Sequence, residues 1–138
     1  MPRSSRKLSR ETAFRIIFAR ELNCDDMSFT EYELSDEVDL ADDDFCNKLV
    51  EITSENLEAI DAVISANLTN WKIDRIPKTS LAILRISCAQ LMYMKDEIPD
   101  RVVINEAVEL AKKYGADDDY SFVNGILRNI RKSIASEQ

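Results

Sequence analysis

The stretch LAILRISCAQLMYM, residues 81–94, decides the fold class because it is the most apolar part of the chain. Its apolar residues cover most of the circumference of a helix, and a helix that is hydrophobic all round is normally buried. Arg85 interrupts the stretch and needs either a partner or access to the surface. The stretch is too short, and too charged, to span a bilayer. We therefore expect a central buried helix.

On both sides of this stretch, apolar residues recur at helical spacing. Pro77 is expected in the first turn of the central helix, and Gly115 just after the end of the next one. Helical spacing continues on both sides of Asn124-Gly125, so Gly125 is expected to allow close approach of another backbone or of a ligand. The expected helices run from about Ser4 to Leu22, around Phe29 to Leu34, from Phe45 to Ile52, from Leu57 to Leu68, over the central stretch, from Val103 to Tyr114 and from Phe122 to Ile134.

The composition agrees with a helical protein. The chain has 138 residues, a length that fits one domain, and 45% of them are hydrophobic, which excludes wholesale disorder. Two Gly and three Pro are too few for the frequent turns of an all-β sandwich. The sequence therefore predicts an all-α fold in which residues 1–138 form a single domain.

Enzymatic chemistry has no support in the residues. The absence of His removes imidazole catalysis and His metal ligands, and no Gly-rich phosphate loop is present. Cys24, Cys46 and Cys88 are too far apart for a Cys-x-x-Cys motif and are expected to be reduced, buried thiols of a cytoplasmic protein. The acidic clusters 42–44 and 117–119 suit helix capping better than cation binding. We expect no catalytic residue, cofactor or metal.

Charge is distributed unevenly along the chain. The net charge is −8, but residues 1–22 carry +4, residues 23–70 carry −13 and residues 71–138 carry +1. Arg3, Arg6, Lys7 and Arg10 have the spacing of one helix face. A polyanion would therefore meet the protein at its basic end. The alternative, a solvated arm that only keeps the protein soluble, stays open at this point.

Two aromatic residues accompany this basic end. Single-stranded RNA is usually bound by cations that contact phosphates together with flat side chains on which bases stack. Phe18 lies two helical turns beyond Arg10, and Phe122 lies at the start of the last helix. Each Phe taken alone is more typical of a core position, and spacing does not tell whether both flank one basic surface.

Taken together, the motifs resemble those of the NusB transcription antitermination factors, over nearly the whole chain. The matching segments are Arg10-Glu11-x-Ala13, Ile83-Leu84-Arg85-Ile86, Ile98-Pro99, Val103–Lys112 (VINEAVELAK), Gly115-Ala116 and Phe122–Leu127 (FVNGIL).

This resemblance implies an all-α fold of about seven helices in two small packed bundles, and a cytoplasmic protein without membrane association. It implies binding to the boxA element of nascent RNA together with NusE, a ribosomal protein, and an indirect link to other Nus factors and RNA polymerase. The pair suppresses termination at ribosomal RNA operons. The RNA-binding positions of the family fall on Arg6, Lys7, Arg10, Phe18, Asp118 and Phe122.

The sequence departs from the family pattern at two positions. Leu8 interrupts a run that is often continuously basic, and Phe18 replaces a frequent Tyr, so weaker RNA affinity without a partner is expected. One alternative is a NusB-like module without an antitermination role, as in domains fused to ribosomal RNA methyltransferases. The residues that face NusE and the oligomeric state, including a homodimer, are left open by the sequence.

Overall fold

In a computed structural model of the protein, described for residues 6–22, 44–69 and 72–136, every regular element is helical. The expected short helix around Phe29 to Leu34 and the expected start of the first helix at Ser4 lie outside these ranges. The described elements are α1 (Arg6–Glu21), α3 (Asp44–Glu55), α4 (Leu57–Ala66), the 3₁₀ turn η2 (Ile73–Arg75), α5 (Lys78–Tyr93), α6 (Asp100–Tyr114) and α7 (Asp119–Ser136). The all-α prediction is confirmed.

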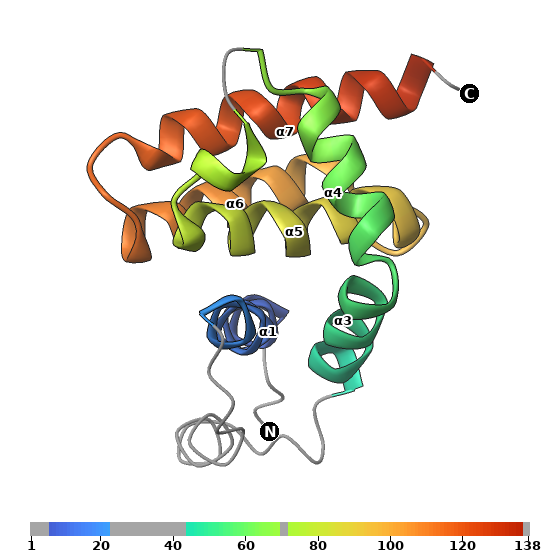
Figure 1. Ribbon diagram of the computed structural model, residues 1–138. Helices are drawn as coiled ribbons and strands as arrows, with labels where there is room; N and C mark the ends of the chain where they lie inside the picture. The colour runs from blue at the N-terminus through green and yellow to red at the C-terminus, as the bar shows by residue number, and fades with distance from the viewer. Residues whose placement is uncertain (1–5, 23–43, 70–71, 137–138) are drawn as a thin grey trace.

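The helices form two small packed bundles that meet at α5 (Figure 1). One bundle contains α1 and α3, which contact each other and both contact α5. The other contains α4, α5, α6 and α7, in which α6 and α7 lie side by side. In Figure 1, α1 and α7 lie on opposite sides of α5. The central helix therefore lies between α1 and α7.

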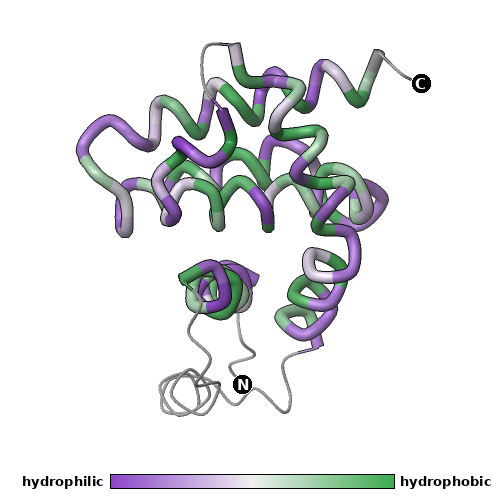
Figure 2. The backbone as a smooth tube through the Cα atoms, viewed as in Figure 1, coloured by the Kyte–Doolittle hydropathy of each residue, from purple (hydrophilic) through white to green (hydrophobic). Residues whose placement is uncertain are grey.

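The central helix is buried as its sequence predicts. Every residue from Ser80 to Leu91 is buried, and Figure 2 shows hydrophobic positions along α5 and along the helices that cover it. Pro77 differs from expectation: it is the N-cap residue with an extended ψ of 139°, one position before the helical turn in which it was expected. A proline fits there because the residue before the first turn has no helical N–H bond to lose.

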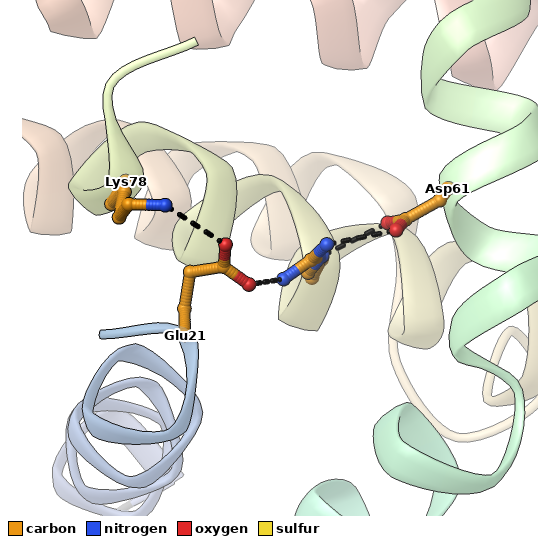
Figure 3. A network of polar contacts seen from close by, with 4 residues as sticks. Glu21, Asp61 and Lys78 are labelled. Atoms are coloured by element: carbon orange, nitrogen blue, oxygen red, sulfur yellow. Dashed lines mark hydrogen bonds and ion pairs between the residues drawn. The ribbon is translucent and has the colours of Figure 1, made fainter. Parts of the chain in front are cut away.

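Arg85 reaches partners from two other helices (Figure 3). Its Nε and Nη2 donate to the two carboxylate oxygens of Asp61 on α4 at 2.9 and 2.8 Å, and its Nη1 donates to Glu21 at the end of α1. Lys78 adds a longer contact of 3.3 Å to Glu21. These hydrogen bonds raise the pKa of Arg85 despite a desolvation effect, the largest single influence, that lowers it. The network ties α1, α4 and α5 together.

Three expectations from the sequence need correction. Leu22 and Leu57 have the apolar spacing of their helices, but they are 51% and 36% exposed, since Leu22 follows the last residue of α1 and Leu57 is the first residue of α4. Gly125 does not mark a close backbone approach, since a Cβ built there would meet nothing within 4 Å. Gly115 does end α6 as expected, and a Cβ there would lie 2.8 Å from the carbonyl oxygen of Ala111.

Candidate nucleic-acid interface

The basic start of α1 presents two exposed cations. Arg6 and Lys7 are both exposed, and the first turn of α1 contains no acidic residue. Lys7 Nζ lies 3.8 Å from a carboxylate oxygen of Glu106 on α6, while 63% of the Lys7 side chain stays exposed. An exposed pair of this length is weak and easily exchanged for a ligand. Arg6 and Lys7 can therefore meet a phosphate group from solvent.

Arg10 differs from these two residues because it is only 5% exposed. Its Nε donates to Oε1 of Gln90 on α5 at 2.7 Å, and Gln90 Nε2 in turn donates to the carbonyl oxygen of Ile86 at 3.0 Å. Burial lowers the pKa of Arg10, Glu106 raises it, and the neighbouring Arg6 lowers it further. An arginine keeps its charge under such shifts. Arg10 thus places a positive charge just beneath the surface formed by Arg6 and Lys7.

The aromatic residue beside these arginines is Phe45, in the first turn of α3. The guanidinium carbon of Arg6 lies 4.5 Å from the centre of the Phe45 ring, and that of Arg10 lies 5.3 Å from it. Both distances are typical of cation–π contacts. From the sequence, Phe45 is expected only as the first residue of a helix that runs to Ile52. The separation between these positions in the chain gives no signal that they meet in space.

Phe18 faces a different neighbour. Its ring stacks on that of Phe14, with centroids 5.7 Å apart and an interplanar angle of 10°. Phe14 is buried and also contacts Tyr114 of α6 at 4.9 Å between ring centroids. Phe18 itself is half-buried, so part of its ring stays accessible at the edge of this aromatic cluster.

Asp118 and Phe122 lie together at the start of α7. The carbonyl oxygen of Asp118 accepts the N–H groups of Ser121 and Phe122 at 3.2 and 3.4 Å. Asp118 is exposed, whereas Phe122 is half-buried and packs against the core. In the same turn, Asp119 Oδ2 accepts the N–H of Ala116 at 2.8 Å, which agrees with a capping role for this acidic cluster.

Glu11 connects α1 to the end of α6, from which this turn follows. Glu11 Oε2 accepts hydrogen bonds from Lys113 Nζ at 2.6 Å and from the hydroxyl group of Tyr114. Burial alone would raise the pKa of Glu11, but these hydrogen bonds and the nearby cations lower it overall. The middle of α1 is therefore fixed beside the C-terminal end of α6, immediately before the turn that carries Asp118.

The described site residues form two groups: Arg6, Lys7 and Arg10 with Phe45 near the start of α1, and Asp118 with Phe122 at the start of α7. Phe18 belongs to neither group, because its ring stacks on Phe14. A family model described as the NusB family matches residues 7–132. The chain belongs to the NusB family.

Known NusB proteins are similar over almost their full length. The transcription antitermination protein NusB of Clostridium novyi (strain NT) is 41% identical, and the alignment covers 94% of this chain and 99% of that protein. The NusB protein of Listeria monocytogenes serotype 4a (strain HCC23) is 40% identical, with 91% and 94% of the two chains covered.

Solved NusB structures have the same fold. T. maritima NusB matches with a TM-score of 0.84 and 32% identity, and covers 95% of this chain and 93% of its own. A chain from a crystal structure of the antitermination factors NusB and NusE in complex with double-stranded RNA matches with a TM-score of 0.80 and 29% identity, over 93% and 96% of the two chains.

No helix within the described residues is long and apolar enough to cross a membrane. They also contain no cluster of three or more metal-ligating side chains.

Proposed function

We propose that this NusB-family protein is a transcription antitermination factor that binds boxA RNA together with NusE and suppresses termination at ribosomal RNA operons. The observation that carries the proposal is the exposed pair Arg6 and Lys7 above the buried charge of Arg10, in a chain 41% identical to a protein named for this function. Residues 1–138 act as one RNA-binding unit in the cytoplasm, without a catalytic step of their own.

Each site residue has a role in this proposal. Arg6 and Lys7 contact phosphate groups directly, and Arg10 supports them through charge and through the position of α1. Phe18 and Phe122 offer ring edges or faces to unpaired bases, since stacking on an aromatic side chain favours single-stranded RNA. Asp118 lies beside Phe122 and accepts hydrogen bonds from base amino groups.

The direct test is binding of a boxA RNA by fluorescence anisotropy, with and without NusE, at several salt concentrations. Each phosphate contact contributes about 0.7 to the slope of log affinity against log salt for single strands, or about fivefold in affinity at 0.1 M salt. The double variant Arg6→Ser/Lys7→Ser should therefore bind about 25-fold more weakly, with a slope smaller by about 1.4.

A matched control is the double variant Lys72→Ser/Arg75→Ser, which removes the same charge from an exposed segment around η2. It should bind boxA RNA nearly as tightly as the unaltered protein. The proposal fails if the unaltered protein binds boxA and scrambled RNA equally, or if both double variants lose affinity to the same extent, because the basic arm would then act only through net charge.

A further inference from the structure

A second basic surface lies between α6 and α7, away from α1. The helices α6 and α7 lie side by side (Figure 1), and residues of both line a cavity of about 400 Å³. Four of its ten lining residues are cationic and none is acidic. The cations are Arg101, Lys112, Arg128 and Arg131, and the other polar groups used below are Asn105, Tyr120 and Asn124. We call this cavity the α6–α7 groove.

Helical periodicity explains why so much positive charge gathers here. On α6, Arg101 and Lys112 are eleven positions apart, about three turns, and so share one face. On α7, Tyr120 and Arg131 have the same spacing, and Arg128 lies between them on the same side. Each helix contributes two cations to the groove in a protein with a net charge of −8. The charge of the groove is therefore opposite in sign to the net charge of the molecule.

These cations are available to a ligand. Within the described residues, neither Arg101 nor Arg128 forms an ion pair. Arg131 makes only a long contact of 3.9 Å with Asp100, and half of its side chain is exposed. Lys112 Nζ lies 5.2 Å from the centre of the Tyr120 ring. Within the described residues, the groove thus holds three cations without an ion pair and the weakly paired Arg131, next to an aromatic ring.

The other lining groups match the chemistry of unpaired nucleotides. Tyr120 is 40% exposed and offers a ring for base stacking. Asn105 and Asn124 bring amide groups, each able to donate to and accept from the edge of a base. An acidic peptide would use the cations but would leave the ring and the amides without a matching group. We propose that the α6–α7 groove is a second binding surface for single-stranded RNA.

The groove is distinct from the basic surface that Arg6, Lys7 and Arg10 form at the start of α1. Glu106 and Lys113, two of the α6 residues that contact α1, point about a third of a turn away from the stripe that contains Arg101 and Lys112. An RNA that occupies both places would cross α6, whose diameter with side chains is ~10 Å. This inference rests on the proposed RNA-binding function and extends the path of the RNA. A longer transcript should use both surfaces.

RNA length separates the two surfaces experimentally. One RNA consists of the boxA element alone, and the other is extended at each end by about ten nucleotides, within the usual range for single-strand-binding surfaces. The unaltered protein should bind the longer RNA more tightly. The double variant Arg101→Ser/Arg128→Ser should bind the short RNA normally but lose up to about 25-fold in affinity for the longer one, while Lys72→Ser/Arg75→Ser keeps it.

A second pair of variants tests stacking without a change of charge. Tyr120 and Tyr93 are exposed to nearly the same extent, 40% and 41%, but only Tyr120 lines the groove. Tyr120→Ala should weaken binding of the longer RNA about fivefold or more, and Tyr93→Ala should leave it unchanged. Photocrosslinking of 5-iodouridine in the extensions should label Tyr120.

The possible results have separate meanings. The inference is overturned if the longer RNA binds no more tightly than the short one, or if the groove variants keep the full gain in affinity. It is also overturned if these variants bind both RNAs normally but lose binding of NusE, because the groove would then be a protein-binding surface. Failure of the unaltered protein to bind boxA RNA at all would instead refute the proposed function.

Discussion

Arg6 and Arg10 stand one helical turn apart on α1, yet only Arg6 is exposed. Arg6 rests on the face of Phe45, and Arg10 is held by Gln90. A contact of this kind restricts the many rotamers of an exposed arginine, so less entropy is lost when a phosphate binds. At the scale of single residues, Phe45 should therefore act as a positioning residue for RNA binding.

The variant Phe45→Leu tests this role, because it removes the ring but keeps most of the apolar volume that packs against the core. Ordering a long side chain costs about 0.5–1.5 kcal/mol, so the loss of this restraint should weaken boxA binding by roughly two- to tenfold. Thermal unfolding serves as the control for stability. Unchanged affinity in a stably folded Phe45→Leu protein would show that Arg6 is already ordered by other means.

The exposure of each cation could not have been predicted from the sequence. Helical spacing correctly puts Arg6, Lys7 and Arg10 close together, but it does not give depth, which depends on α5 and on Gln90 in particular. Phe45 was missed for the same reason. Its position beside Arg6 results from the packing of α3 against α1, and no periodicity within either helix reports that packing.

At the scale of elements, the ion network around Arg85 should hold three helices in place. Arg85 joins Glu21 at the end of α1 to Asp61 on α4, and only 10% of its side chain is exposed. Replacing it with Met would remove the cation that Asp61 and Glu21 share, and would leave Glu21 with only the longer contact to Lys78. Breaking a fully buried pair costs about 3–5 kcal/mol; because both carboxylates are partly exposed, about 2–3 kcal/mol is expected for Arg85→Met.

Urea unfolding measures this effect, and Lys78→Met is the matched control. Lys78 also contacts Glu21, but its side chain is 54% exposed, so its removal should cost less than about 1 kcal/mol. Adding Glu21→Gln and Asp61→Asn to Arg85→Met should recover much of the lost stability. Equal costs for Arg85→Met and Lys78→Met would contradict a special role for the network.

The helices themselves were largely predictable, because apolar spacing and helix-ending residues are local signals. The buried α5 and the end of α6 at Gly115 follow directly from such signals. The need of Arg85 for a partner was also predictable, but the identity of its partners was not. Glu21 and Asp61 approach Arg85 only because α1 and α4 pack against α5. The α6–α7 groove escaped prediction likewise, since its cations come from two helices.

At the scale of the whole molecule, two carboxylates should make stability depend on pH. Glu11 joins α1 to α6, and Glu21 joins α1 to α5. Burial raises the pKa of both carboxylates, but hydrogen bonds lower it overall to below the ordinary value of 4.5. The donors are Lys113 and Tyr114 for Glu11, and Arg85 and Lys78 for Glu21. A folded-state pKa below the unfolded one means that folding favours the charged form.

The stabilisation from Glu11 and Glu21 is therefore complete above about pH 5 and is lost as the pH falls through their lowered folded-state pKa values. Urea unfolding at pH 7, 5, 4 and 3 should give a free energy that falls only at the acidic end. The double variant Glu11→Gln/Glu21→Gln should be less stable at pH 7, but its free energy of unfolding should fall less on acidification. The control Glu58→Gln changes an exposed residue of α4 and should show the same pH dependence as the unaltered protein. If the free energy of unfolding falls equally on acidification in all three proteins, other carboxylates dominate the pH dependence. In that case α1 is held to α5 and α6 mainly by its apolar face.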